Sequence, residues 1–340
     1  IKNNLFLHFC GGESISDSES TILSLAKYNI GTILDYAVEG ENTEEAFDHT
    51  AAEIIRTIDR SANDPNIPFC VFKPTGMASI DLLEKVQPGK KLTKEETLSF
   101  ERIKNRWDRV CGESFNHDER IFIDSEDSYI QDPIDMIIYE LMERYNREKA
   151  IVWNTYQMYR VGMLDNLEKA IEKARRKEYF FGAKLVRGAY MEKERERAEV
   201  MGYPDPIQPD KNATDSAYDT GLELCIKNRD IVSVCSGSHN ERSNYYLTEL
   251  MADAGMLPGD ERVYFAQLYG MSDHISFNLA KAGYNVVKYV PYGPVDAVIP
   301  YLLRRAEENT SISGQSSREF TLIQKELRRR KAGRKKSQIT

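Results

Sequence analysis

Chemically reactive side chains stand at the ends of eight short apolar runs in this sequence. These residues are Asp35, Lys73, Asp124, Asn154, Arg187, His239, Gln267 and Tyr289. Turns by themselves favour Gly, Ser, Asn and Asp, whereas acids, bases, an imidazole and a phenol can bind a polar ligand and exchange protons with it. Each residue alone also has a structural interpretation. Asp35 could cap a helix, Lys73 could be a surface charge, and His239 could be a hydrogen-bonded structural residue. The set as a whole predicts a polar pocket.

A second candidate group lies near the end of the chain. Tyr301, Arg304, Arg305 and Glu308 are spaced i, i+3, i+4 and i+7, so a helix would bring them to one face. Two neighbouring guanidinium groups suit the bidentate recognition of a carboxylate. One interpretation is a helix over the pocket that presents both arginines to an anion. The other is a surface helix with an Arg304–Glu308 pair, and the spacing leaves both open.

The histidines and cysteines give little support for a metal site. The five histidines are His8, His49, His117, His239 and His274, without a His-x-His pair, and the five cysteines contain no Cys-x-x-Cys. A metal-dependent hydrolase built on Asp35, Asp124 and His239 would require more ligands at closer spacing. We therefore predict no metal, and we interpret the odd number of cysteines as buried, reduced thiols.

The elements that must position these residues alternate along the chain. β-rich apolar runs predict eight buried strands, and the segments between them have apolar residues at helical spacing. The runs are 32–34, 69–72, 121–123, 151–153, 184–186, 231–235, 263–266 and 286–290. Eight such units predict an α/β fold, a closed (β/α)8 TIM-like barrel, with a doubly wound open sheet as the alternative. Barrel active sites form at the carboxyl ends of the strands, where the polar residues stand. Ser272 is expected to cap the seventh helix.

Composition indicates a globular chain with a basic end. The 340 residues are 41% apolar with a mean hydropathy of -0.54, and no run approaches the 18 apolar residues of a membrane-spanning helix. The net charge of -8 combines +7 on residues 325–340 with -15 on residues 1–324. The acidic body argues against nucleic-acid binding. We predict one catalytic domain over 1–324 and a basic tail over 325–340, which is either a solvated terminus or a contact for an anionic membrane surface.

Several segments of the sequence resemble one family. They are 184–190 (KLVRGAY), 267–271 (QLYGM), 288–293 (KYVPYG) and 301–309 (YLLRRAEEN). Together with 33–39, 154–157 and 238–240, they resemble the motifs of the proline dehydrogenases, in the family's order, over residues 5–325. The resemblance implies a distorted (β/α)8 barrel whose last helix lies over the barrel mouth. It also implies oxidation of L-proline to Δ1-pyrroline-5-carboxylate, the first step from proline to glutamate.

FAD is the cofactor that this resemblance implies. The chain has no G-x-G-x-x-G segment, so the cofactor is expected on the barrel mouth and not in a Rossmann fold. The resemblance places Arg187, His239 and Asn240 near the pyrophosphate and adenosine, and Asn154, Lys184, Gln267 and Glu308 near the flavin or ribityl chain. Asn154 and Lys184 depart from relatives that have Gln and Arg there. Gly188, Tyr190 and Ser238 complete the implied cofactor site.

The resemblance also implies a substrate site. Arg304 and Arg305 would bind the proline carboxylate, and Lys73 and Asp124 would form a polar pair beside the ring. The implied walls of the site, which press the ring against the flavin, are Tyr190, Leu268, Tyr289 and Tyr301. Glu39 would pair with the first arginine and gate entry. The predicted catalytic residues are Lys73, Asp124, Tyr289, Arg304 and Arg305.

The implied mechanism is hydride transfer from C5 of proline to N5 of the flavin. Lys73, Asp124 and water remain as alternative acceptors of the amine proton. The family passes electrons to a membrane quinone, which implies peripheral contact with the cytoplasmic face of a bacterial inner membrane or the matrix side of the mitochondrial one. The alternative functions are hydroxyproline dehydrogenase, which Tyr289 disfavours by filling the space of a 4-hydroxyl, the metal-dependent hydrolase, and a scaffold without catalytic activity.

Overall fold

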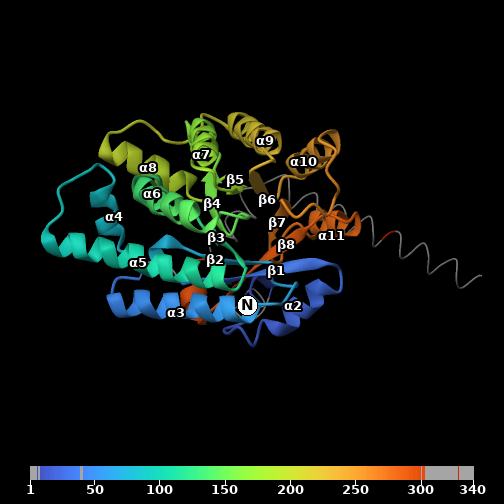
Figure 1. Cartoon of the computed structure of the whole chain (residues 1–340), viewed down its shortest axis with the longest axis horizontal. Helices are drawn as coiled ribbons and strands as arrows, with labels where there is room; N and C mark the ends of the chain where they lie inside the picture. Colours follow the sequence, from blue (N-terminus) through green and yellow to red (C-terminus); the bar gives the residue numbers. More distant parts are fainter. Residues whose placement is uncertain (1–5, 7, 39–40, 300, 303–327, 329–340) are drawn as a thin grey trace, which may run out of the picture.

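The computed structural model describes residues 6, 8–38, 41–299, 301–302 and 328 (Figure 1). Its eight strands pair in parallel, each with the next, and β8 pairs with β1 from Ile30 opposite Val286 to Tyr36 opposite Tyr292. The strands are β1 (Ile30–Tyr36), β2 (Phe69–Phe72), β3 (Arg120–Ile123), β4 (Val152–Gln157), β5 (Phe181–Val186), β6 (Val232–Gly237), β7 (Val263–Leu268) and β8 (Val286–Tyr292). The predicted closed barrel is confirmed, and the open sheet is excluded.

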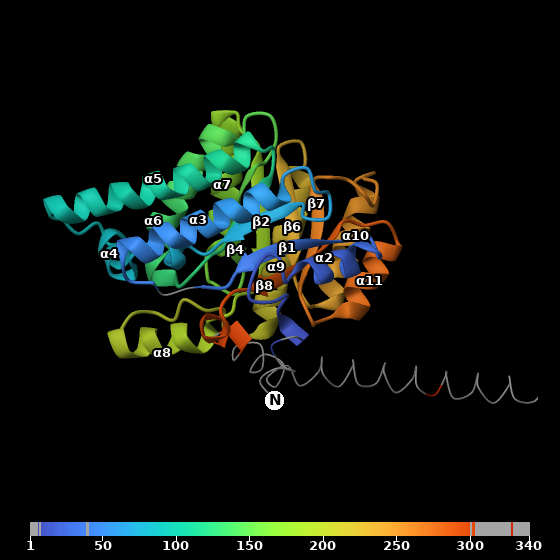
Figure 2. The ribbon, with the colours of Figure 1, turned by 90° about the horizontal axis from the view of Figure 1, so that it is seen from below.

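Helices connect the strands and surround the barrel (Figures 1 and 2). α2 (Glu19–Ala26) precedes β1, and α3 (Glu44–Ser61) links β1 to β2. The others are η1 (Pro74–Gly76), α4 (Ile80–Val86) and α5 (Lys94–Asn116) before β3, α6 (Ser128–Tyr145) before β4, α7 (Met163–Lys177) before β5, α8 (Met191–Met201) and α9 (Lys211–Lys227) before β6, α10 (Glu241–Asp253) before β7 and α11 (Asp273–Lys281) before β8. Local sequence sets their starts: α5, for example, begins with a capping box between Thr93 and Glu96.

Several strands are longer than the apolar runs that predict them. Asp35, Asn154 and Gln267 lie inside β1, β4 and β7 and not beyond their ends. An apolar run ends at the first polar side chain, but the strand continues because the backbone of a polar residue still pairs in the parallel ladder. Asn154 pairs with Ala183, and Gln267 pairs with Lys288. The correction matters because side chains alternate between the two faces of a strand. A residue inside a strand can therefore face the helices and not the barrel interior.

Aromatic rings fill the barrel interior below the carboxyl ends of the strands. Phe69 stacks on Phe122 with ring centroids 4.2 Å apart, and it meets the edges of Trp153 and Tyr264 at 5.2 and 4.7 Å. The residue facing Trp153 on β5 is Gly182, where a Cβ would come 2.4 Å from the indole. A larger apolar core packs the outer faces of the strands against the helices. The barrel is thus solid below its mouth.

An apolar cluster covers part of the barrel mouth. Val298, Tyr301 and Leu302, from helical residues 295–299 and 301–302, pack with Phe9 and with Met271 in the loop after β7. The described start of the last helix therefore lies over the carboxyl ends of the strands, as the resemblance implies. Glu39, Arg304, Arg305, Glu308 and the tail, apart from Arg328, lie outside the described residues.

Within the described ranges, no helix combines the length and the apolar character that crossing a membrane requires. The five cysteines are buried and form no disulfide, as the sequence predicts.

Candidate active site at the barrel mouth

Two acids, two lysines and a tyrosine meet at the carboxyl ends of the strands. We call this group the mouth cluster, and its members are Asp35, Lys73, Asp124, Lys184 and Tyr289. Alternation along the strands directs these side chains to the interior, on the same side as the stacked aromatic rings. Asp35 is 2% exposed and Lys184 is 4% exposed, so their charges must be satisfied within the protein.

Ion pairs join the members of the mouth cluster. Nζ of Lys73 lies 2.7 Å from both carboxylate oxygens of Asp35 and 3.9 Å from Asp124. Nζ of Lys184 donates to Asp124 and to the hydroxyl of Tyr289, and that hydroxyl lies 3.3 Å from Oδ1 of Asp124. Two ammonium groups thus face two carboxylates, and the buried charges balance.

The pKa values follow from this arrangement. Burial alone would raise the pKa of Asp124, but the ammonium groups of Lys184 and Lys73 outweigh it and lower the pKa below its usual value. Burial and the neighbouring Asp124 carboxylate raise the pKa of Tyr289 well above its usual value. At neutral pH the mouth cluster therefore holds an ionised Asp124 beside a protonated Tyr289.

Lys184 marks the boundary between the polar mouth and the aromatic interior. Its Nζ lies 5.1 Å from the ring centroid of Phe122 and 4.7 Å from that of Tyr289. The negative faces of aromatic rings stabilise a cation at this range. Ion pair, hydrogen bond and ring contacts together fix the ammonium at one place.

A second polar group surrounds the ends of β5, β6 and β7. We call it the rim cluster, and its members are Arg187, Ser238, His239, Asn240 and Gln267. The guanidinium of Arg187 donates to Asp215 of α9 at 2.7 Å and to the hydroxyls of Ser238 and Ser243 at 2.8 and 2.9 Å. Five donors in a planar fork suit this role, and they would suit phosphate oxygens equally.

Ser238 lies at the centre of the rim cluster. Its hydroxyl accepts from the backbone N–H of Asn240 at 3.1 Å, and its carbonyl accepts from Nε2 of Gln267 at 3.1 Å. Nδ1 of His239 lies 2.9 Å from the hydroxyl of Ser272. Ser272 does stand at the N-cap of α11, but its side chain makes no cap bond, contrary to expectation, because its backbone is left-handed with a φ of 53°.

Two predicted flavin contacts face the helices and not the interior. Nδ2 of Asn154 donates to Asp135 of α6 at 3.0 Å, and Oε1 of Gln267 accepts from Ser276 of α11 at 2.8 Å. The sequence prediction that Asn154 reaches the barrel mouth is wrong, because β4 continues past it and places its side chain on the outer face. Gln267 likewise connects β7 to α11.

Gln157, which the sequence analysis leaves out, occupies the interior face at the carboxyl end of β4. It lies three residues beyond Asn154 and therefore on the opposite face of the strand. Its side chain is buried, and its Oε1 lacks a hydrogen-bond partner in the part of the chain that the structure describes. A buried acceptor without a donor is costly, which marks a place for a ligand to donate. Extending the apolar run 151–153 through Tyr156 would have found it.

The remaining predicted residues lie around the two clusters. Leu268, at the end of β7, packs both against the interior rings and against the cover that contains Tyr301. Gly188 and Tyr190 lie in the loop from β5 to α8. The structure thus brings together most of the predicted residues on β2, β3, β5, β6, β7 and β8. The other predicted residues, Glu39, Arg304, Arg305 and Glu308, lie outside the described residues.

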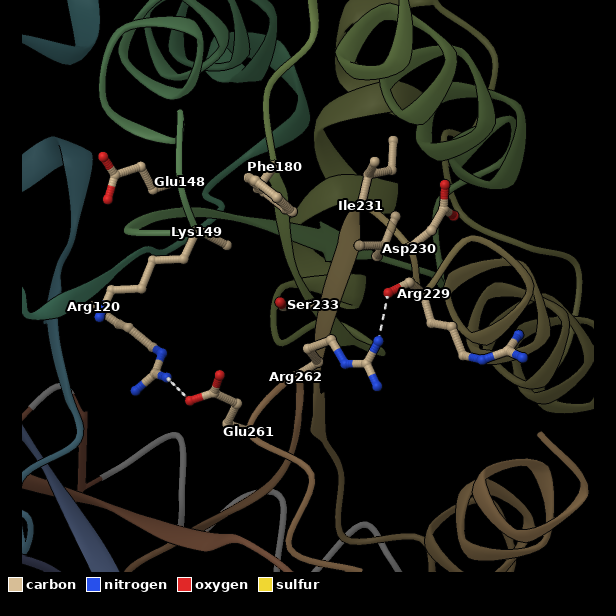
Figure 3. Close-up of a pocket in the computed structure, with 12 residues that line it drawn as sticks. Arg120, Glu148, Lys149, Phe180, Arg229, Asp230, Ile231, Ser233, Glu261 and Arg262 are labelled. Carbon is tan, nitrogen blue, oxygen red and sulfur yellow. Dashed lines mark hydrogen bonds and ion pairs between the residues drawn. The ribbon is translucent and has the colours of Figure 1, made fainter. Parts of the chain in front are cut away.

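A cavity of about 140 Å³ lies at the opposite end of the barrel, at the amino ends of the strands (Figure 3). Arg120 and Arg262 line it; Arg120 lies 3.7 Å from Glu261, and Arg262 donates to the carbonyl of Arg229. Barrel enzymes carry their chemistry at the carboxyl end and stability at the amino end. No group of three or more metal-ligating side chains occurs in the described ranges.

Comparison with known proteins agrees with the geometry. A sequence model of the family described as proline dehydrogenase matches residues 18–318. The chain is 43% identical to human "Proline dehydrogenase 1, mitochondrial" over 243 residues, which cover 71% of this chain and 40% of the human protein. It is 34% identical to the carbapenem antibiotics biosynthesis protein CarD of Pectobacterium carotovorum subsp. carotovorum over 96% of this chain and 84% of CarD. At 40% coverage, the matched part of this chain spans less than half of the human protein.

Solved structures show the same fold. The proline utilization A protein of Bdellovibrio bacteriovorus superposes with a TM-score of 0.81 at 21% identity, over 92% of this chain and 33% of that protein. A "Hydroxyproline dehydrogenase" of Xenopus laevis is 31% identical over 97% of this chain and 78% of its own length. With the family model matching from residue 18 to residue 318, the chain belongs to the proline dehydrogenase family.

Proposed function

We propose that this chain oxidises L-proline to Δ1-pyrroline-5-carboxylate with FAD as its cofactor. The observation that carries the proposal is the mouth cluster: a charge-balanced set of lysines and aspartates, with one wall made by Tyr289, at the catalytic end of a barrel of this family. A zwitterion such as proline needs both a cationic and an anionic partner, and this cluster offers both.

The residues at the mouth fit FAD. The buried Oε1 of Gln157 lacks a donor among the described residues, and the oxidised flavin ring has one N–H group that can supply it. Gly188 has a φ of 129°, and a Cβ there would come 2.4 Å from the ring of Tyr159, so the loop after β5 requires glycine. Arg187 and His239 of the rim cluster offer donors for phosphate oxygens. When bound, FAD accepts the hydride from C5 of proline.

Gln157 and Lys184 hold the flavin in this proposal, and Gln157 takes the place that the sequence analysis gave to Asn154. Arg187, Gly188, Ser238, His239 and Asn240 hold the phosphate and adenosine side. Gln267 supports this side indirectly, since its amide donates to the carbonyl of Ser238. Tyr190, in the loop after β5, borders the cofactor and also forms part of the wall of the substrate site, together with Tyr289, Leu268 and Tyr301.

The chain's own residues orient the substrate. Because its pKa is lowered, Asp124 stays ionised and accepts a hydrogen bond from the substrate amine without taking its proton. Lys73, held by Asp35 at 2.7 Å, keeps its ammonium beside Asp124. The amine proton therefore passes to water, and Tyr289, which stays protonated, forms a wall together with Leu268 and Tyr301.

The remainder of the proposal rests on the family resemblance. Arg304 and Arg305 bind the proline carboxylate, each charge-assisted bond contributing about 1.5–3 kcal/mol. Glu39 pairs with Arg304 and controls entry, and Glu308 contacts the flavin side. Electrons pass to a membrane quinone, through peripheral contact at the cytoplasmic face of a bacterial inner membrane or the matrix side of the mitochondrial inner membrane.

Anaerobic reduction tests the proposed function. The FAD-loaded protein is mixed with L-proline, and the loss of visible flavin absorbance is followed. We expect bleaching with proline, about 100-fold slower in Asp124→Asn because the substrate loses an ionised partner that orients it. The matched control is Asp118→Asn, an exposed aspartate beyond the other end of β3 that pairs with Lys149.

Two results would contradict the proposal. A protein that does not bind FAD, or that binds it without bleaching by proline, has a different function. Faster bleaching with trans-4-hydroxy-L-proline than with proline would instead assign the hydroxyproline reaction, for which the Xenopus laevis relative is named.

A further inference from the structure

Helix α8 has little apolar surface to hold it in place. Of its 11 residues, only Glu194 and Ala198 are buried. A surface helix usually docks by burying an apolar stripe, but Met191, Val200 and Met201 of α8 are exposed. Figure 2 shows α8 below α4 at the edge of the molecule. Polar contacts must therefore fix this helix.

Glu194 makes the principal contact. It is 1% exposed; its Oε1 accepts from the backbone N–H of Ser128 at 2.5 Å, and its Oε2 accepts from the Ser128 hydroxyl at 2.5 Å. Ser128 is the first residue of α6, whose N-cap residue, Asp127, makes no side-chain cap bond. A carboxylate from another helix thus takes the position of the cap, where unpaired N–H groups and the helix dipole favour an anion.

Two ion pairs flank this contact but contribute less. Nζ of Lys193 lies 2.7 Å from Asp127, and the guanidinium of Arg197 lies 2.5 Å from Glu84 of α4. The Lys193 side chain is 56% exposed and the Glu84 side chain is 41% exposed. Ion pairs with such exposed members contribute little because solvent screens them. The guanidinium of Arg197 also lies 3.8 Å from the ring centroid of Tyr129 on α6. Among these contacts, the Glu194 carboxylate is the one buried at both partners.

Glu194 joins the first turn of α8 to the first turn of α6, and a proposed site residue shortly precedes each of these turns in the chain. Asp124 precedes Ser128 by four residues, and Tyr190 precedes Glu194 by four residues. The intervening side chain of Lys193 lies 5.7 Å from the ring of Tyr190. We propose that Glu194 is a positioning residue that fixes Tyr190, and with it one wall of the substrate site, relative to Asp124.

This inference rests on the proposed function, which gives Tyr190 its place beside the substrate. Glu194 itself touches no substrate. Without its carboxylate, α8 and the loop before it are held less firmly against α6, so the substrate ring is enclosed less well. Lys184 and Tyr289 stay on barrel strands and Lys73 directly follows β2, so KM for proline rises while kcat changes little.

A double-mutant cycle tests the inference. KM and kcat for proline are measured for Glu194→Ala, Tyr190→Ala and the double variant, with Glu194→Gln as the milder change that keeps hydrogen-bonding atoms and removes the charge. Glu199→Ala, exposed on the same helix, is the matched control. We expect KM to rise about tenfold in Glu194→Ala and in Tyr190→Ala, and no further in the double variant, because both changes remove one interaction.

A readout without activity accompanies the cycle. Trypsin can cleave α8 after Lys193, Arg195 and Arg197, and cleavage requires local opening of the helix. We expect faster cleavage in Glu194→Ala and Glu194→Gln than in the parent and in Glu199→Ala.

The outcomes separate the inference from the proposed function. Absence of proline oxidation in the parent protein contradicts the proposed function, and with it the part of the inference that concerns the substrate. An active parent with unchanged KM in both Glu194 variants, or effects of Glu194→Ala and Tyr190→Ala that multiply in the double variant, overturns the inference alone.

Discussion

Tyr289 acts in the mouth cluster through two separate parts of its side chain. Its hydroxyl receives a hydrogen bond from Lys184 and lies 3.3 Å from Asp124, whereas its ring lies under the Lys184 ammonium and packs on the interior core. The hydroxyl therefore belongs to the charge network and the ring to the shape of the pocket. Substitutions that remove the ring test the second part.

Replacing Tyr289 by Ala should widen the pocket where a 4-hydroxyl would lie. We expect the ratio of kcat/KM for trans-4-hydroxy-L-proline to that for L-proline to rise about tenfold, the scale of discrimination by one lost contact in a pocket wall. Steady-state kinetics with both substrates measure it. Tyr284→Ala is the control, because that ring packs against Phe265 outside the barrel interior. An unchanged ratio in Tyr289→Ala would locate the wall elsewhere.

Gln157 provides a test of the cofactor site. Replacing it by Ala removes the buried amide that faces the barrel mouth, so we expect the dissociation constant of FAD to rise about tenfold, the equivalent of one hydrogen bond. Fluorescence titration of the apoprotein with FAD measures this constant. Gln208→Ala, at a partly exposed position outside the strands, should bind FAD like the parent. Equal affinity of the two variants would remove Gln157 from the site.

At the scale of the element, α6 carries a buried polar network behind β4. Oδ1 of Asp135 accepts from Gln131 at 2.8 Å and from Asn154 at 3.0 Å, and Gln131 in turn accepts from the backbone N–H of Glu126. Burial raises the pKa of Asp135 from 3.8 to about 6, in spite of these two hydrogen bonds. The network therefore joins the loop after β3 to the middle of β4 at the cost of a buried charge.

The raised pKa of Asp135 makes stability fall as pH rises. The folded chain holds this proton more tightly than the unfolded chain, so the stabilisation is complete below pH 3.8 and is lost as pH rises through about 6, by at most about 3 kcal/mol. Asp135→Asn keeps an acceptor for both donors and removes the charge. It should be about 1–3 kcal/mol more stable than the parent at pH 8 and nearly equal at pH 4.

Urea unfolding at the two pH values checks this prediction. Asp253→Asn, an exposed aspartate of α10, should show no such dependence on pH. A destabilised Asp135→Asn at pH 8 would mean that the charge itself holds the network together.

The elements were predictable from the sequence, whereas the directions of several side chains were not. Eight β-rich runs predict eight strands, because a strand buried on both faces is apolar throughout. The end of a strand is harder to predict when its last residues are polar. β4 continues through Asn154 to Gln157, although the apolar run ends at Trp153. Which face a residue occupies depends on the register of the ladder, and this is why Asn154 was placed at the mouth and Gln157 was not predicted. Lys73, Asp124 and Lys184 do lie at the mouth, on or directly after their strands, and the roles that the resemblance implies for them stay predictions.

At the scale of the whole molecule, the two ends of the barrel differ in what they contain. The carboxyl end holds the mouth and rim clusters, and the amino end holds Arg120, whose guanidinium lies 5.7 Å from the ring centroid of Phe69 and 5.5 Å from that of Tyr264. Arg120 thus closes the aromatic interior from below. A change here should affect stability and leave catalysis intact.

Replacing Arg120 by Leu removes two cation–ring contacts of about 0.5–1 kcal/mol each. We expect the melting temperature to fall by about 2–4 °C, with KM and kcat for proline unchanged. Thermal unfolding and steady-state kinetics of the FAD-loaded protein measure both effects. Arg176→Leu, exposed on α7, should change neither. A raised KM in Arg120→Leu would show that the two ends are coupled.

The stacked rings of Phe69, Phe122, Trp153 and Tyr264 have one further consequence. They make the barrel a tube that is closed at the bottom, so a molecule that enters at the mouth can leave only by the same opening. Under the proposed function, L-proline therefore enters and Δ1-pyrroline-5-carboxylate leaves by this one end of the barrel. The product must therefore depart before the next molecule of proline can bind.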